Sequence, residues 1–161
     1  MIIKRIIACA LLMTTAVSIS NAGLGVFGSY WNQKDGDNVL GGGVSYQPVL
    51  LPVEIRGTFY ERTSAPGAGS FRTIPIDLGL TFALTRDTPI HASVIGGGSY
   101  YFLEPSDGSL DNKFGWYAGG RLEMQVQPGT ALFGELMYRG ADFSNVQGDF
   151  SGIAFNVGLL F

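Results

Sequence analysis

Charged residues, cysteines and long apolar runs are all scarce in this chain of 161 residues. Charged side chains make up 14% of it, against about 25% in an ordinary soluble domain, whereas glycine occurs 24 times. The one cysteine, Cys9, lies in the N-terminal apolar segment, so we expect no disulfide or thiol chemistry in the rest of the chain. After residue 22 no stretch approaches 18 consecutive apolar residues, and no window has a helical apolar period. These absences exclude a helical bundle and a membrane-spanning helix beyond residue 22.

The first 22 residues have the organisation of a secretory signal. Lys4 and Arg5 form a basic start, an apolar run covers Ile6 to Val17, and residues 20–22 are small enough for a cleavage site. The alternative, a membrane-spanning helix, would need about 20 apolar residues. We therefore expect a cleaved signal peptide at 1–22 and one mature domain at 23–161. That domain would carry 8 basic and 13 acidic residues, with no basic patch for nucleic acid.

Beyond the signal, alternating apolar and polar residues between clusters of Gly, Pro, Asp, Asn and Ser predict β-strands. Eight segments have this pattern. The expected strands are Leu24–Trp31, Val39–Gln47, Pro52–Glu61, Phe71–Leu84, Pro89–Phe102, Phe114–Val126, Thr130–Arg139 and Phe150–Phe161.

The connections between these strands alternate in length. Four are long and polar (Asn32–Asn38, Arg62–Ser70, Leu103–Lys113 and Gly140–Asp149), and three are short (Pro48–Leu51, Thr85–Thr88 and Gln127–Gly129). Long loops at one end and tight turns at the other are typical of an up-and-down barrel of the outer-membrane kind.

Each expected strand separates apolar from polar residues by parity, because alternate side chains of a strand point to opposite faces. In the last strand the apolar face consists of Ile153, Phe155, Val157, Leu159 and Phe161. A soluble barrel would show the same alternation with its polar face in water. Here the polar faces are mostly Gly, Ala and Ser with a few charges of both signs, which suits a narrow lumen better than a hydrated surface. The apolar faces are therefore predicted to contact lipid.

Aromatic residues cluster near the long connections, as in the girdle of a barrel at a membrane interface. The predicted girdle is Tyr30, Phe59, Phe71, Tyr100, Phe102, Phe114, Trp116, Tyr138 and Phe150.

Together the signal, the eight strands, the alternating connections and Phe161 resemble the small outer-membrane barrels of the OmpA/OmpX type, over Gly23 to Phe161. The resemblance implies an all-β, eight-stranded antiparallel up-and-down transmembrane β-barrel in the bacterial outer membrane. It also implies that Ile153, Phe155, Val157, Leu159 and Phe161 are the signal read by the barrel-assembly machinery. Because the expected strands extend to Phe161, we expect neither the periplasmic domain of full-length OmpA-like proteins nor a role in cell-wall anchoring.

The inward parity collects seven charged residues that we predict to form a lumen charge network: Glu54, Arg56, Asp77, Arg121, Glu123, Glu135 and Arg139. Eight strands enclose a space only just wide enough for side chains, where charges need partners. A hairpin centred on Pro128 places Arg121 opposite Glu135, and one centred near Pro66–Gly67 brings Arg56 close to Asp77. We predict that both pairs are ion pairs near mid-height of the lumen. The network would be a structural plug or, alternatively, a gate of a narrow pore.

A hydrolase is the other alternative, because His91 and Ser93 form an H-x-S pair like that of some outer-membrane lipid A deacylases. Parity and position place this pair inside the barrel at the short-turn end, whereas a deacylase needs it on the lipid face near the outer leaflet. We therefore expect no enzyme activity and no catalytic residues. No cofactor or metal site is expected either, because the loop acids lack the spacing of a calcium loop.

The sequence thus predicts a non-catalytic, monomeric outer-membrane barrel with a structural or adhesion-type role through four external loops. Its expected partners are outer-membrane lipid or lipopolysaccharide, the assembly machinery during biogenesis, and an external ligand or host surface, with no nucleic acid. The alternatives are a porin-like channel and a lipid-modifying enzyme.

Overall fold

The computed structural model describes residues 22–48, 51–65, 69–85, 89–105, 112–141 and 149–161. Strands, whose side chains alternate with a two-residue period, make up almost all of these ranges. Within these ranges there are nine strands: β1 (Ala22–Gln33), β2 (Val39–Pro48), β3 (Val53–Tyr60), β4 (Arg62–Ala65), β5 (Gly69–Ala83), β6 (Ile90–Pro105), β7 (Lys113–Gln127), β8 (Thr130–Gly140) and β9 (Gly152–Leu160).

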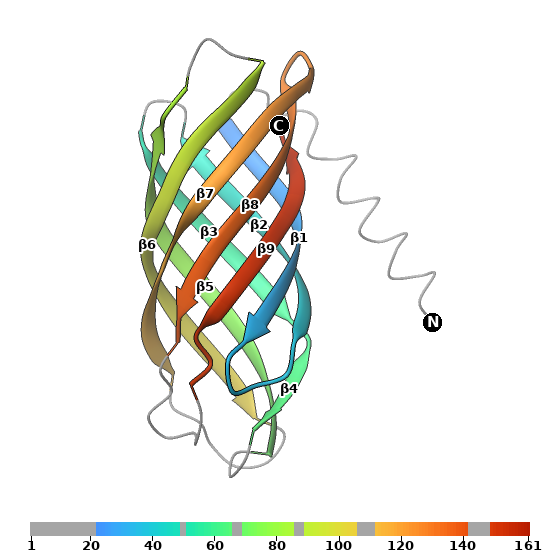
Figure 1. Cartoon of the computed structure of the whole chain (residues 1–161), viewed down its shortest axis with the longest axis vertical. Coiled ribbons are helices and arrows are strands. Elements are labelled where there is room, and N and C mark those ends of the chain that lie inside the picture. Colours follow the sequence, from blue (N-terminus) through green and yellow to red (C-terminus); the bar gives the residue numbers. More distant parts are fainter. Residues whose placement is uncertain (1–21, 49–50, 66–68, 86–88, 106–111, 142–148) are drawn as a thin grey trace, which may run out of the picture.

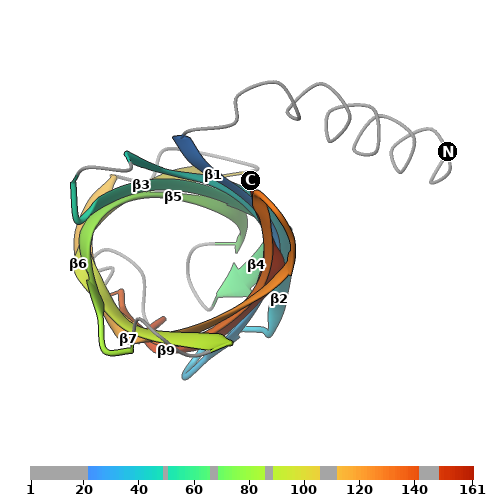
Figure 2. The same ribbon diagram turned by 90° about the horizontal axis from the view of Figure 1, so that it is seen from above.

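The strands form one antiparallel sheet that closes on itself (Figures 1 and 2). Their order is β3-β2-β1-β9-β8-β7-β6-β5-β4, and pairing of β3 with β5 completes the ring. Because β4 continues β3 along the same partner, the wall has eight strands. The predicted eight-stranded up-and-down barrel is therefore confirmed.

A β-bulge at Glu61 separates β3 from β4. Arg56 pairs with Asp77, but Arg62 pairs with Arg72, so the β3–β4 side has one residue more than β5. The Glu61 N–H donates to the Leu40 carbonyl at 2.8 Å, and the Leu40 N–H donates to Glu61 Oε1 at 3.0 Å. The extra residue reverses the phase of the strand. Even-numbered side chains point inward before it, and Thr63 does so after it.

This bulge explains why the expected long connection at Arg62–Ser70 is wrong. Most of that segment is β4 and the start of β5, which pair from Arg62–Arg72 to Ala65–Gly69. The sequence of β4, Arg62-Thr63-Ser64-Ala65, does not alternate apolar and polar residues, so the two-residue pattern could not predict it as a strand. Other strand ends differ from prediction by up to three residues; for example, β6 continues to Pro105, and β9 begins only at Gly152.

The tight turn from β7 to β8 contains the one positive backbone φ angle of the described residues, 79° at Gly129. Such an angle favours glycine, which explains the Pro-Gly pair between Gln127 and Thr130. This turn lies at the same end of the barrel as the C-terminal end of β9 (Figure 1). The predicted signal peptide falls almost entirely on residues 1–21, which lie outside the described residues.

The wall separates an apolar exterior from a packed interior. Large side chains such as Leu78, Leu122 and Val157 are exposed on the outside, whereas Asp77, Arg121 and Asn156 on the inside are buried. Among the described residues no helix is long and apolar enough to cross a membrane. A closed sheet satisfies every ladder hydrogen bond and needs its apolar exterior covered, so this barrel is built to stand in lipid.

Candidate functional site: the barrel lumen

Two arginines and two glutamates form a compact cluster in the lumen. Arg56 donates from Nη1 to Glu135 Oε2 at 2.7 Å and from Nη2 to Glu54 Oε1 at 2.5 Å. Arg121 donates from Nε to Glu135 Oε1 at 2.6 Å and from Nη2 to Glu54 Oε2 at 2.5 Å. Each guanidinium therefore contacts both carboxylates, which balances the charges within the cluster.

Strand register assembles this four-residue cluster. β3 supplies Glu54 and Arg56 two residues apart, hence on one face, and β7 and β8 place Arg121 directly opposite Glu135. The expected Arg121–Glu135 pair is thus brought together inside the barrel. Asn156 of β9 donates to Glu135 Oε2 at 2.8 Å, which adds a neutral partner to the same carboxylate.

Asp77 and Arg139 form a second ion pair. Arg139 donates from Nη2 to Asp77 Oδ2 at 2.6 Å and from Nη1 to Oδ1 at 3.1 Å, and the Ser99 hydroxyl donates to Oδ1 at 2.7 Å. The predicted Arg56–Asp77 ion pair is therefore wrong, although the two residues are register partners. The Arg56 guanidinium extends instead to Glu54 and Glu135, because a side chain that long reaches past its cross-strand neighbour.

Glu123 is the seventh residue of the predicted network and the least enclosed. Its Oε1 lies 3.5 Å from Arg121 Nη1, and a quarter of its side chain is exposed. It lies next to the short-turn mouth of the barrel, since β7 ends at Gln127.

Aromatic side chains fill much of the lumen around and beyond these charges. Trp31 packs against Tyr60 and Tyr101, with ring centroids 5.3 and 6.1 Å apart. Phe27 and Phe133 contact each other edge to face and lie beneath the guanidinium groups of Arg56 and Arg121, respectively. The predicted lumen network consists of charges alone and does not include this aromatic layer, although parity already places Trp31 on the inner face.

Phe71 and Phe150 correct the predicted girdle. Both are completely buried, and their rings meet edge to face at 5.5 Å inside the loop-side end of the barrel. Parity could have shown this, because Phe71 shares the face of Asp77 and Phe150 shares that of Asn156. The other predicted girdle residues lie on the outer face, with Tyr100 half-buried between Phe102 and Phe114: Tyr30, Phe59, Tyr100, Phe102, Phe114, Trp116 and Tyr138.

The residues of the predicted assembly signal lie along the outer face of β9 and just after it. Ile153, Phe155 and Val157 are exposed, whereas Leu159 and Phe161 are half-buried. The Phe161 N–H donates to the Leu24 carbonyl at 2.8 Å, so pairing with β1 continues beyond the last residue of β9. The role of this strand in assembly stays a prediction.

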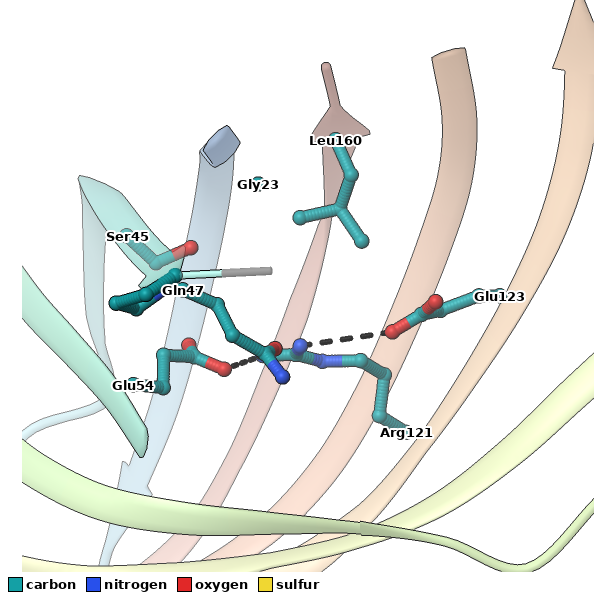
Figure 3. Close-up of a pocket in the computed structure, with 8 residues that line it drawn as sticks. Gly23, Ser45, Gln47, Glu54, Arg121, Glu123 and Leu160 are labelled. Atoms are coloured by element: carbon teal, nitrogen blue, oxygen red, sulfur yellow. Dashed lines mark hydrogen bonds and ion pairs between the residues drawn. The ribbon is translucent and has the colours of Figure 1, made fainter. Parts of the chain in front are cut away.

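At the short-turn mouth two adjoining cavities of about 190 and 240 Å³ share Gln47 and Glu123 among their lining residues. We refer to the two together as the vestibule. In Figure 3 the side chains of Glu54, Arg121 and Glu123 meet at its inner end, and the Gln47 side chain reaches toward them. His91 and Ser93 also line it, which agrees with the inward, short-turn position expected for that pair.

At the opposite, loop-side rim, an ion pair joins two connections that are distant in sequence. Lys34 Nζ lies 3.0 Å from Asp149 Oδ2, and the Ser151 N–H donates to Asp149 Oδ1 at 2.9 Å. Hydrogen bonds from Ser151 and Lys34 lower the pKa of Asp149 to about 2, and the hydrogen bond with Asp149 raises the pKa of Lys34. Residues 142–148, which precede Asp149 in the sequence, lie outside the described residues.

No family model matches the sequence, and no curated protein matches it either. Among solved structures, the fold is similar to that of the outer membrane protein OprG from Pseudomonas aeruginosa, with 11% identity, a TM-score of 0.62, and 86% of this chain and 93% of that chain covered. It is also similar to the N-terminal β-barrel domain of Pseudomonas aeruginosa OprF (13% identity, TM-score 0.53, 88% and 98% covered). A major outer membrane protein from Thermus thermophilus gives 13% identity, a TM-score of 0.53, and 87% and 98% coverage. At these identities the likeness establishes a shared outer-membrane barrel fold, as the sequence pattern predicts, and leaves activity open.

Proposed function

We propose that this protein is a non-catalytic, monomeric barrel of the bacterial outer membrane, with a sealed lumen and a structural role in the envelope. Its loop-side rim faces the exterior and serves surface interactions. The observation that carries the proposal is the filled interior. Two balanced charge clusters and the aromatic layer around Trp31 occupy the space that a conducting barrel would leave to water.

A porin-like channel is the main alternative, and the packing of the lumen argues against it. Eight-stranded barrels have room for side chains and little else. Passage of a hydrated ion would require Arg56 and Arg121 to leave both of their carboxylate partners together.

Planar-bilayer recordings test this point. The purified barrel should give no discrete conductance steps, and a known porin reconstituted in the same bilayers supplies the positive control. Regular conductance steps from the wild-type barrel would contradict the sealed lumen.

The lipid-modifying enzyme is the second alternative. His91 and Ser93 line the vestibule, so neither side chain reaches the outer, lipid-facing surface where a lipid substrate would lie. A His91→Ala variant should therefore match the wild type in the lipid A composition of expressing cells, measured by mass spectrometry. A change in acylation that depends on His91 would overturn the non-catalytic assignment.

The surface-interaction part of the proposal concerns the loop-side rim, much of which lies outside the described residues. Binding of the wild-type barrel to host matrix, lipopolysaccharide or phage should be lost when the four loop-side connections are shortened. If the trimmed barrel folds and binds equally, the rim is not an interaction surface and the structural role stands alone.

A further inference from the structure

Among the described charged side chains at the vestibule of the short-turn mouth, carboxylates outnumber guanidinium groups. Its inner end is the charge cluster of Arg56, Arg121, Glu54 and Glu135, whose charges cancel. Glu123 adds a third carboxylate to these two guanidinium groups. Within the described part of the chain its one ion pair is the 3.5 Å contact with Arg121, and a quarter of its side chain is exposed, so its oxygens retain acceptor capacity toward the cavity.

The second polar group that we assign to the vestibule site is the Ser93 hydroxyl. Ser93 as a whole residue is more than nine-tenths buried and lines the cavity, yet its Oγ has no hydrogen-bond partner among the described residues. A buried hydroxyl left without a hydrogen bond costs about 1–3 kcal/mol. In the β6–β7 pairing, Ser93 lies opposite Arg121 and His91 lies opposite Glu123. The two polar groups of the site, Ser93 and Glu123, therefore belong to the same inward face of these neighbouring strands.

We infer that the vestibule binds a small organic cation with N–H donors, of the primary ammonium class, from the aqueous side of the short-turn mouth. The Glu123 carboxylate supplies the counter-charge. Ser93 Oγ and the amide oxygen of Gln47 supply neutral acceptors, so a –NH₃⁺ group with its three donors matches the three acceptors in number.

Anions and metal ions fit this site less well. An anion would need a cation that has no carboxylate partner, but Arg121, the one arginine or lysine among the described lining residues, already contacts Glu54, Glu135 and Glu123. A metal ion needs several strong ligands close together, and the described residues contain no group of three or more His, Cys, Asp or Glu side chains that could hold one. Although the charge cluster forms its inner end, binding in the vestibule requires neither a sealed lumen nor an external ligand, so the inference does not depend on the proposed function.

Matched probes can test this inference on the full barrel in detergent micelles. Methylammonium and tetramethylammonium have the same charge, but only methylammonium carries N–H donors. In an NMR titration, methylammonium should shift the backbone amide signals of Gln47, Ser93 and Glu123 in a saturable manner, and tetramethylammonium should not.

Variants identify the residues responsible. Glu123→Gln should weaken methylammonium binding by about tenfold or more, because it removes a charged acceptor. Ser93→Ala should weaken it by a smaller factor without altering the charge. Glu104→Gln removes an exposed carboxylate at the opposite end of the barrel and should leave binding unchanged.

Three results would overturn the inference: equal binding of both probes, no effect of either vestibule variant, or an equal loss in Glu104→Gln. Tighter binding of Mg²⁺ or Zn²⁺ than of methylammonium at the same residues would also overturn it, because the site would then be a metal site. Ser93→Ala provides a test if Glu123→Gln does not fold.

Discussion

At the scale of single residues, the buried ion pairs limit which substitutions the lumen tolerates. Asp77 and Arg139 are completely buried and bind each other through two hydrogen bonds. Removing one partner leaves a charge in a low-dielectric interior, so Arg139→Met should destabilise the barrel by about 3–5 kcal/mol. Urea titrations of folding into micelles, followed by tryptophan fluorescence, measure this change.

The double variant Asp77→Leu with Arg139→Met is the control for that experiment. It removes both charges and keeps most of the volume, so it should recover most of the lost stability. If instead the losses from Asp77→Leu and Arg139→Met simply add, the two residues are not coupled in the way their geometry indicates.

Asp149 provides a second prediction for a single residue, this time at the solvated rim. Its pKa of about 2 in the folded protein lies below the usual value for an aspartate, about 3.9. The group therefore contributes stability above about pH 4, and this contribution is lost as the pH falls through about 2. Because Ser151 is the largest cause of the shift, Ser151→Ala should raise the pKa of Asp149 more than Lys34→Gln does. An NMR titration of the Asp149 carboxyl carbon decides between these causes.

At the scale of a strand, the two faces of β6 impose opposite requirements on neighbouring glycines. A Cβ on Gly97 would collide with the backbone of Leu78 and Gly79 on β5, whereas a Cβ on Gly98 would meet only the Gly115 carbonyl, at 4.0 Å. Gly97→Ala should therefore cost about 1–3 kcal/mol through overpacking. Gly98→Ala should be neutral or stabilise the fold by up to about 1 kcal/mol, because it restricts the unfolded chain.

The same urea titration compares these two adjacent positions directly. Equal destabilisation by both substitutions would mean that the inside and outside of β6 are assigned incorrectly. The close approach of the β5 backbone explains why glycine is needed at position 97 in the middle of β6.

The terminal strand is the other element with a testable role. Phe161 pairs with Leu24 through its backbone, and a substitution to alanine leaves that pairing possible. If the Phe161 side chain is part of the assembly signal, Phe161→Ala should lower the amount of folded barrel in outer-membrane fractions. The stability of the barrels that do assemble should change little. Unchanged assembly in cells would remove the proposed signal while leaving the fold intact.

At the scale of the whole molecule, the two tryptophans report on opposite sides of the wall. Trp31 is completely buried in the lumen, whereas Trp116 is 52% exposed on the outer face near the loop-side end. In bilayers containing brominated lipids, the Trp31→Phe variant, which retains Trp116, should be quenched strongly, and most by bromines close to the headgroup. The Trp116→Phe variant, which retains Trp31, should be quenched weakly. The reverse order would show that the barrel is not inserted with this outer face in lipid.

A structural feature of this barrel can be predicted from the sequence when the residues that produce it are close together in the chain. Period-two alternation is a local property of the strands, so it predicts the barrel, most strand positions and the inward location of Glu54, Arg121 and Glu135. The pairing of Arg121 with Glu135 is equally local, because a short hairpin joins β7 to β8.

Other features arise only when the sheet closes. The bulge at Glu61 shifts the register of β4, and pairing with β5 makes this segment a strand although it has no apolar alternation. Closure also brings Arg139 across to Asp77, 62 residues away in the chain, and Arg56 to Glu135, 79 residues away. Neither of these two pairings can be predicted from the positions of the residues in the sequence. Several oppositely charged residues share the inner face, and which of them pair depends on how far each side chain extends across the lumen. The burial of Phe71 and Phe150, by contrast, was already encoded in their parity, and closure supplies the shared space in which their rings pack.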